Sequence, residues 1–375
     1  MKKVCVVTAA RSEYGVLRWV IDGIDKDENL QLQLIVTGGH LSPEQGLTYK
    51  AIIDDGYNID SKVEMLLSSD SPVGISKSMG LCLIGISDTF DRLKPDIIVV
   101  LGDRYELLPI VESALIMKIP VAHISGGDVT EGAIDNEIRN AVTMMATLHF
   151  PSVEDSANNI RRMLGKNLNI YVVGEPGLDN FNKLSLMSRK EIANNLRLNI
   201  DKKWILVTVH PETQESLEYN LNIAKNIKSI LDSLVDINVI ITKANTDLGG
   251  FQINKYWTSV VQENSQRYKL FSSLGQKRYL SFMKECTFVF GNSSSGIIEA
   301  PCLGIPVMNV GDRQQGRHLC KNIFQVSNDI DSMKKTCEFI LRTNKKSFDN
   351  YYGDGHASEK IVNIIKEYLY SNSNI

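Results

Sequence analysis

The sequence predicts an α/β fold with two doubly wound domains, each a parallel sheet covered by helices on both faces. Three observations carry this prediction. Short apolar runs alternate with amphipathic segments of helical length, the alternation restarts midway along the chain, and 375 residues suffice for two domains of ordinary size. Unbroken apolar runs are typical of strands buried on both faces, and ligands of such sheets bind beyond the carboxyl ends of the strands.

Five apolar runs in the first half are predicted to be strands. They are VCVVTA (4–9), LQLIVTG (32–38), IIVVLGD (97–103), VAHISGGD (121–128) and IYVVGEPG (170–177). The segment GEPGLDNF (174–181) supplies Gly and Pro where this series stops. We therefore expect a first domain at residues 1–175.

Five further runs predict the strands of a second domain at residues 176–355. They are WILVTVHPET (204–213), VIITKANTD (239–247), YKLFSSLG (268–275), TFVFGNSSSG (287–296) and PVMNVGD (306–312). Residues 215–234 are predicted to form a helix between the first two. Residues 356–375 contain Ile361, Ile365 and Leu369 at helical spacing, which predicts a packed final helix that could cross back to the first domain.

Composition excludes several classes of partner. A hydrophobic content of 43%, a charged content of 23% and a net charge of −3 are those of a globular protein and give no electrostatic case for nucleic acid or anionic lipid. The first apolar run is too short for a signal peptide or a membrane anchor. The six cysteines are scattered without a CxxC pair, which predicts reduced thiols and a cytoplasmic protein.

The segment 290–317, FGNSSSGIIEAPCLGIPVMNVGDRQQGR, predicts a diphosphate site. Ser293 and Ser294 open a short helix whose N-terminus favours an anion, and Glu299 lies on the same helix. Arg313 and Arg317 follow the next strand and add positive charge. The alternative is a serine N-cap on an ordinary surface helix.

Carboxylates cluster after two strands of the first domain. In LGDRYE (101–106), Asp103 follows a buried strand and could serve as an acid or base, or simply cap the next helix. HISGGDVTEGAIDNEIRNA (123–141) contains Asp128, Asp135 and Arg139. Because Asp135 and Arg139 are four residues apart, they could instead form a surface ion pair. Together these carboxylates predict one wall of an active site.

Other candidates also follow strands. His40 and His210 could contact a ligand or be buried structural histidines, and Arg11 could approach a diphosphate or be solvated. Lys243 and Asn245 are weaker candidates at the edge of the second sheet. No histidine spacing indicates a metal, no G-x-G-x-x-G follows the first strand and no P-loop occurs, so we expect neither a metal nor another cofactor.

Seven ordered motifs together resemble the hydrolysing UDP-N-acetylglucosamine 2-epimerases of sialic acid biosynthesis. They are TAARSEYG, VTGGH, LGDRYE, HISGGDVTEGAIDNEIR, VTVHPET, GNSSSGIIEAP and GDRQQGR, and they cover the chain from Val4 to about Arg317. The resemblance implies two Rossmann-like domains around a cleft, the glycosyltransferase-B architecture. It also implies a UDP-sugar substrate, no membrane or nucleic-acid partner, and a homodimer or homotetramer.

Carried over by position, the resemblance implies roles for individual residues. Catalysis would rest on the carboxylates Asp103, Asp128 and Asp135. UDP would be held by His210, Ser293, Ser294, Glu299 and Arg313, with the serines and Arg313 on the phosphates and Glu299 on the ribose. The diphosphate or sugar would be positioned by Arg11, His40 and Arg139. Many relatives have Glu where this chain has Asp128, which shortens the side chain by one methylene, about 1.5 Å of reach; even a small misplacement of an acid or base is costly. Either the backbone lies closer here or Glu131 assists.

The implied reaction is departure of UDP from C1 with loss of the C2 proton, followed by addition of water to the resulting glycal. The expected products from UDP-N-acetylglucosamine are UDP and N-acetylmannosamine. Alternatives are the same reaction on UDP-2,4-diacetamido-2,4,6-trideoxyglucose for legionaminic acid, a non-hydrolysing epimerase, a glycosyltransferase and a non-catalytic sugar-nucleotide sensor. A sensor is expected to lack at least one of Asp103, Asp128 and Asp135, and all three are present.

Overall fold

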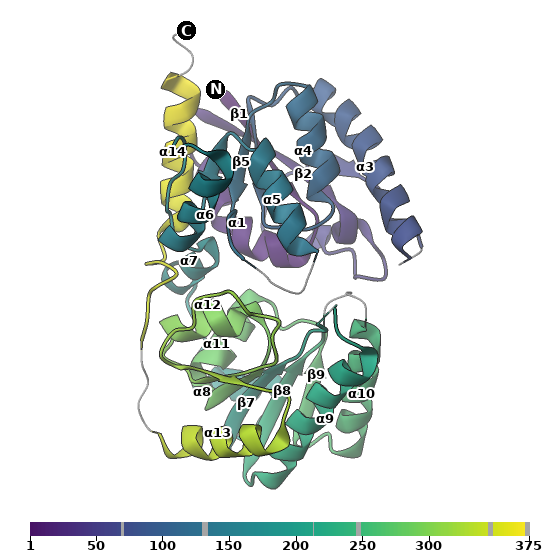
Figure 1. Ribbon diagram of the computed structural model, residues 1–375, viewed down its shortest axis with the longest axis vertical. Coiled ribbons are helices and arrows are strands. Elements are labelled where there is room, and N and C mark those ends of the chain that lie inside the picture. The colour runs from purple at the N-terminus through teal and green to yellow at the C-terminus, as the bar shows by residue number, and fades with distance from the viewer. Residues whose placement is uncertain (69–70, 130–133, 213, 245–248, 344–347, 372–375) are drawn as a thin grey trace. The chain divides into compact units, whose positions relative to one another are not determined.

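The computed structural model describes residues 1–68, 71–129, 134–212, 214–244, 249–343 and 348–371, drawn as ribbons in Figure 1. They form two compact units. The first contains Met1–Asp128, Ile134–Asn182 and the C-terminal segment from Tyr352, and the second contains Val129 and Lys183–Tyr351. The sequence placed the boundaries at 175/176 and 355/356; in the structure the units change after Asn182 and before Tyr352.

The first unit contains a six-stranded sheet in the order β3-β2-β1-β4-β5-β6, and every neighbouring pair is parallel. β1 and β4 lie at its centre and are almost wholly buried, as their unbroken apolar runs predict. The strands are β1 (Lys2–Thr8), β2 (Leu30–Thr37), β3 (Ser61–Val63), β4 (Ile97–Leu101), β5 (Val121–Ile124) and β6 (Leu148–Phe150).

The prediction that IYVV (170–173) forms a strand is wrong. Only Ile170 forms an isolated parallel bridge, with His149, and the last strand of the sheet is β6 instead. Tyr171 donates its backbone N–H to the His149 carbonyl, and Val173 donates to the Pro151 carbonyl. Because proline has no N–H to return to the 170–173 segment, the ladder cannot continue there.

Helices cover both faces of the first sheet (Figure 1). The short elements among them are η1 (Gly38–Leu41), α2 (Tyr49–Asp54), η2 (Pro176–Leu178) and α7 (Asp179–Lys183). The longer ones are α1 (Arg11–Asp25), α3 (Pro72–Leu93), α4 (Leu107–Ile116), α5 (Asp135–Met145), α6 (Glu154–Leu164) and α14 (Ala357–Ser371).

The final helix α14 packs against α1 within the first unit. Its apolar residues Ile361, Ile365 and Leu369 are buried in the same core as the central strands. Asp179 caps the helix by accepting backbone N–H bonds from Ala357 at 2.9 Å and from the next residue at 2.8 Å. This cap explains why the first unit continues past residue 175.

The second unit repeats the architecture with strand order β12-β11-β10-β7-β8-β9, again all parallel. The predicted helix at 215–234 is confirmed as α9 (Leu217–Ser233), with the Ser216 side chain accepting from the Tyr219 N–H at its start. The strands are β7 (Lys203–Thr208), β8 (Ile237–Thr242), β9 (Tyr268–Phe271), β10 (Phe288–Gly291), β11 (Val307–Val310) and β12 (Ile323–Val326). The other helices are α8 (Arg189–Leu196), α10 (Gly250–Glu263), α11 (Gln276–Glu285), α12 (Ser294–Cys302) and α13 (Ile330–Arg342).

Both sheets have the same connectivity. Counted from the first strand of each, the spatial order is 3-2-1-4-5-6, the order of Rossmann-type nucleotide-binding sheets. The chain therefore reverses direction across each sheet between β1 and β4 in the first unit and between β7 and β10 in the second. Ligands of such sheets bind at this switch point, beyond the carboxyl ends of the strands.

Candidate active site

The loop after β4 holds Asp103 against a buried arginine from α5. Gly102 turns the chain with φ +83°, and Asp103 then forms an ion pair with Arg139. The Arg139 side chain is 2% exposed and that of Asp103 is 27% exposed, so the carboxylate keeps access to solvent while its partner does not. Asp103 is therefore not a helix cap, since α4 begins only at Leu107 and Glu106 precedes it.

Arg139 also joins Asp128 to this group. Its Nη1 donates to the Asp128 backbone carbonyl at 2.8 Å, while the Asp128 Oδ1 accepts from the Ser156 hydroxyl at 2.6 Å. A side chain on Gly127, whose φ is +77°, would overlap the Ser156 carbonyl, so the loop packs directly on α6. The structure thus brings Asp103, Arg139 and Asp128 together, and Asp135 is half-buried at the start of the same helix that carries Arg139.

His123 connects the β4 loop with α5. Its Nε2 lies 2.8 Å from the Gly102 carbonyl, and its Nδ1 lies 3.2 Å from the Thr143 hydroxyl. Because a carbonyl can only accept, Nε2 carries the proton and Nδ1 accepts from Thr143. Burial lowers the pKa of His123 to about 4, so the ring is neutral near pH 7. Its place on a predicted strand was the only sequence signal for His123.

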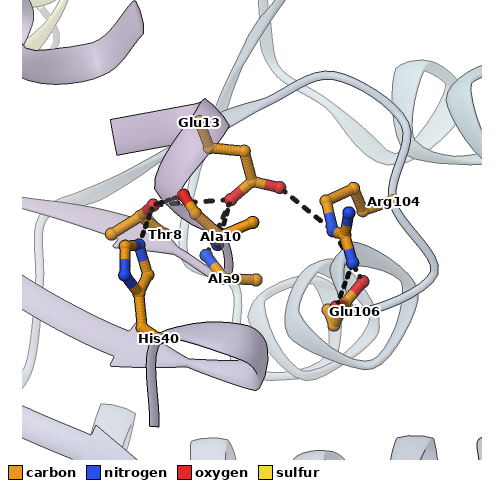
Figure 2. A network of polar contacts seen from close by, with 7 residues as sticks. All are labelled: Thr8, Ala9, Ala10, Glu13, His40, Arg104 and Glu106. Atoms are coloured by element: carbon orange, nitrogen blue, oxygen red, sulfur yellow. Dashed lines mark hydrogen bonds and ion pairs between the residues drawn. The ribbon is translucent and has the colours of Figure 1, made fainter. Parts of the chain in front are cut away.

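The loop after β1 contains a buried carboxylate that sequence reasoning missed. Figure 2 shows Glu13 reaching back over the start of α1, where its Oε2 accepts the N–H of Ala9 at 2.7 Å and that of Ala10 at 3.3 Å. A carboxylate at a helix N-terminus is favoured by the helix dipole. The signal was available in the acidic residue of the first helical turn, two positions after Arg11.

His40 is completely buried beside this carboxylate (Figure 2). Its Nε2 lies 3.1 Å from the Thr8 hydroxyl, and its Nδ1 lies 2.9 Å from that of Thr48. Burial lowers the pKa of His40 to about 4. Both ring nitrogens of His40 are therefore hydrogen-bonded within the first unit, as expected for a buried structural histidine. A contact of His40 with substrate stays a prediction.

Glu13 is expected to make stability depend on pH in a definite direction. Burial raises its pKa to about 7 from an ordinary value of 4.5, against the opposing charge of Arg104. The folded state therefore binds the Glu13 proton more tightly than the unfolded state does. The contribution of this group to the free energy of unfolding is complete below pH 4.5 and is lost as pH rises through 7. The shift corresponds to about 3 kcal/mol.

Urea unfolding of the wild type and of Glu13→Gln between pH 4.5 and 8 measures this contribution. The free energy of unfolding of the wild type should fall relative to the variant by about 3 kcal/mol across that range. The buried histidines His40 and His123, with pKa values lowered to about 4, act in the opposite direction and are common to both proteins. A constant difference between the two curves would contradict the assignment.

In the second unit, Asn292 holds three strand-end loops together. Its Oδ1 accepts from the His210 N–H at 2.7 Å, and its Nδ2 donates to the His210 carbonyl at 2.9 Å. Its own carbonyl accepts from Arg313 Nη1 at 3.2 Å and from Gln314 Nε2 at 3.0 Å. Asn292 is fully buried, and these hydrogen bonds place the His210 and Arg313 loops relative to each other.

Glu212 makes a second connection between the same loops. Its Oε1 accepts the Asp312 N–H at 3.1 Å, and burial raises the pKa of its carboxyl group. Arg317, farther along that loop, has a buried Nε and Nη1 for which the described residues provide no hydrogen-bond partner. The loop therefore carries Arg313 and a second guanidinium that is not saturated by the described part of the chain.

The serines after β10 form the N-terminus of α12. Ser293 is the N-cap and accepts from the Ser295 N–H at 3.4 Å. A serine N-cap is what an ordinary surface helix would also have, and this role is compatible with ligand binding. The Tyr279 hydroxyl lies 2.5 Å from the Ser295 hydroxyl, so the side chain of Ser295 is directed toward α11. Ser294, the first residue of the helix, is half-buried.

The remaining predicted residues lie on helices or after other strands, or fall outside the described residues. Glu299 accepts a hydrogen bond from Gln276 Nε2 at 3.3 Å, which joins α12 to the start of α11. Arg11 is exposed at the first position of α1. Lys243 is exposed just after β8, and Asn245 and Glu131 lie outside the described residues. Among the described residues, the predicted candidates of each domain thus follow the strands at the switch point of their own sheet or lie beside them.

Two twisted parallel sheets of Rossmann order, each with its polar residues at the carboxyl ends of the strands, define a protein of the glycosyltransferase-B fold class. Residues 22–366 match the family described as UDP-N-acetylglucosamine 2-epimerase, and the chain belongs to that family. The sequence-based expectation of the fold is confirmed, and that of the family is confirmed at this level.

Two relatives agree with this assignment, and a solved structure agrees with the fold. The chain is 40% identical over 334 residues to GDP/UDP-N,N′-diacetylbacillosamine 2-epimerase (hydrolyzing) of Campylobacter jejuni, covering 88% of this chain and 86% of the relative. It is 30% identical to UDP-N,N′-diacetylbacillosamine 2-epimerase (hydrolyzing) of Legionella pneumophila, covering 98% and 96%. UDP-GlcNAc 2-epimerase from Neisseria meningitidis, solved bound to UDP-GlcNAc, superposes with a TM-score of 0.83 at 18% identity, covering 97% and 100%.

The described residues contain neither a membrane-spanning helix nor a metal-binding cluster. None of their helices combines the length and the apolarity needed to cross a bilayer. Within the same part of the chain, no group of three or more His, Cys, Asp or Glu side chains is arranged as a metal site.

Proposed function

We propose that this protein is a hydrolysing UDP-sugar 2-epimerase. The observation that carries the proposal is the group formed by Asp103, Arg139 and Asp128 at the carboxyl end of the first sheet, in a chain 40% identical to a relative named as a hydrolysing 2-epimerase. A solvent-accessible carboxylate held by a buried guanidinium is suited to proton transfer, because its position is set while its reactive oxygen can be reached.

The second unit would hold the leaving group. The N-terminus of α12 with Ser293 and Ser294 supplies hydrogen-bond donors and a positive dipole end, and Arg313 adds a full charge. His210 would contribute to holding UDP, and Glu299, supported by Gln276, would bind the ribose hydroxyls. These groups stabilise the negative charge that grows on the diphosphate as the bond to C1 breaks.

The first unit would act on the sugar. As the C1–O bond breaks, its electron pair leaves with UDP, and a carboxylate among Asp103, Asp128 and Asp135 accepts the C2 proton, which yields a glycal. Water then adds at C1, and a proton is returned to C2 from the opposite face. Arg139 holds two of these residues, and Arg11 would help to place the diphosphate or sugar. Because the C2 hydrogen is not activated by a carbonyl group, departure of UDP must run ahead of proton removal.

UDP-N,N′-diacetylbacillosamine, which is UDP-2,4-diacetamido-2,4,6-trideoxyglucose, is the preferred substrate in this proposal. Two relatives named for it are 40% and 30% identical over most of the chain. This reverses the order of the two substrates expected from the motifs, which placed UDP-N-acetylglucosamine and sialic acid biosynthesis first. The motifs are proposed to bind UDP, which both substrates share, so the names of the relatives are the support for preferring one sugar.

Product analysis with both sugar nucleotides in heavy water tests the proposal. We expect free UDP, the 2-epimeric free sugar and one solvent deuterium at C2, with kcat/KM at least about tenfold higher for the diacetamido substrate; one missing or added polar contact is worth that much. A preference for UDP-N-acetylglucosamine would restore the N-acetylmannosamine assignment. Recovery of an epimerised but intact UDP-sugar would identify a non-hydrolysing enzyme, and absence of deuterium would overturn the elimination.

We also infer a homodimer or homotetramer in the cytoplasm. Exposed apolar side chains on the adjacent helices α3 and α4 support an assembly: Ile84 is 66% exposed, Leu115 52% and Ile116 77%. Burying exposed apolar side chains against a second copy is favourable, because it removes apolar surface from water.

A further inference from the structure

Arg104 lies between two buried carboxylates that come from opposite sides of the switch point (Figure 2). Its Nη2 donates to Glu106 Oε1 at 2.8 Å and its Nε to Glu106 Oε2 at 3.2 Å, a bidentate pair. The same Nε lies 3.7 Å from Glu13 Oε1. The side chains of Glu106 and Glu13 are 1% and 8% exposed. The guanidinium therefore neutralises charge that water cannot reach.

Glu13 anchors this arginine to the other half of the sheet. Its Oε1 is buried and has no hydrogen-bond partner among the described residues, so Arg104 is the group that compensates this oxygen electrostatically. Its Oε2 is bound by the backbone of Ala9 and Ala10 at the end of β1. The Glu13–Arg104–Glu106 set, here called the Arg104 clamp, thus joins the β1 loop to the β4 loop.

The clamp acts on the residue next to Asp103. Gly102 is held by His123, Asp103 by Arg139 and Arg104 by Glu106, so three consecutive residues are each tied to a different buried partner. Moving Arg104 would leave the Glu106 carboxylate buried without its cation, which costs several kcal/mol. A displacement of about 1 Å at a reacting group can lower turnover by about 100-fold.

We propose that Glu106 and Glu13 are positioning residues, which act through Arg104 to hold Asp103 in its reactive position. The inference rests on the proposed function in one respect, the catalytic role of Asp103. Neither glutamate needs to touch substrate, since both are directed into the clamp.

The experiment compares Glu106→Gln and Glu13→Gln with Glu112→Gln. Glutamine keeps the size of each side chain and removes its charge, and Glu112 is an exposed carboxylate on the same helix α4. For Glu106→Gln we expect kcat to fall about 10- to 100-fold with KM and UDP affinity changed less than about threefold. The kcat of Glu13→Gln should fall less, because Glu13 lies farther from Arg104 than Glu106 does. The kcat of Glu112→Gln should equal that of the wild type. A shared fall of kcat and UDP affinity would indicate general loosening and overturn the inference.

Hydrogen exchange of the unliganded proteins provides a second readout that needs no turnover. The amides of Gly102 and Leu107 donate to the carbonyls of Ile124 and Arg104 and report on both ends of the loop. They should exchange at least about tenfold faster in Glu106→Gln, and at the wild-type rate in Glu112→Gln. Wild-type exchange together with kcat within twofold of wild type would overturn the inference.

Two further outcomes separate the possible failures. If Glu106→Gln does not fold, the same kcat and exchange measurements on Glu13→Gln and Arg104→Lys test the inference. Lysine at position 104 keeps the charge but cannot bind Glu106 through two nitrogens. If the wild type converts no UDP-sugar, the proposed function fails, and the exchange rates still show whether the clamp holds the Asp103 loop.

Discussion

Replacing Asp103 with Asn should lower turnover by about 10²- to 10⁴-fold while UDP affinity changes less than about threefold. The substitution keeps the size and one hydrogen-bonding oxygen of the side chain but removes its ability to accept a proton. UDP affinity is retained because the proposed phosphate and ribose contacts, such as those of Ser293 and Arg313, belong to the second unit. Steady-state kinetics of UDP release, with calorimetric titration of UDP, measures both quantities.

Two controls make this result specific to the site. Asp88→Asn changes an exposed aspartate of α3 and should leave kcat within twofold of wild type. Asp103→Asn also removes the charge opposite Arg139, whose side chain is 2% exposed, so its thermal unfolding must be followed. If Asp103→Asn is folded at the assay temperature and turns over at a near-normal rate, the assignment of this carboxylate is wrong.

Replacing Gly291 with Ala should be the most damaging single change to the second unit, with a loss of at least about 4 kcal/mol of stability. Gly291 ends β10 with φ +142°, a conformation closed to other residues, and pairs with Thr208 of β7. A Cβ at this position would overlap the Thr208 carbonyl oxygen, which is backbone and cannot rotate away. Thermal and urea unfolding measure the loss, and UDP affinity should fall with it because Ser293 follows two residues later.

Gly56→Ala is the matched control. Gly56 also has a positive φ, +95°, but a Cβ there meets no described atom within 4 Å. The loss of stability in Gly56→Ala should therefore come from conformational strain alone and amount to about 1 kcal/mol. Equal losses in the two variants would show that strain alone, and not the overlap with β7, makes Gly291 necessary.

Strand prediction succeeded where a strand is central and failed where it is short or at an edge. β4 and β10 are buried over their whole length, so their apolar runs are unbroken and easily read. β3 spans only three residues, Ser61–Val63, with one of them buried, and carries no such signal. The opposite error occurred at 170–173, where an apolar run lies beside β6 but Pro151 ends the ladder.

Candidate site residues were found by residue type and place after a strand, whereas their partners were not. The spacing suggested that Arg139 could pair with Asp135 on one helix face, whereas in the structure Arg139 forms an ion pair with Asp103, 36 residues earlier. Spacing along a helix predicts local pairs only, and this contact depends on how α5 packs beside β4. Asn292 was passed over for a related reason, since its role is to connect loops that are distant in sequence.

The sequence by itself determined the doubly wound fold and the presence of clustered carboxylates, and it predicted a phosphate site in the segment at 290–317, because buried strands and helix N-termini have local signatures. Only the tertiary structure decided that Glu13 and Glu106 meet at Arg104, and that His123 and Arg139 hold the residues on either side of the Gly102–Asp103 bond. Strand order sets these contacts, and strand order arises from packing between segments far apart in the chain, which no local pattern encodes.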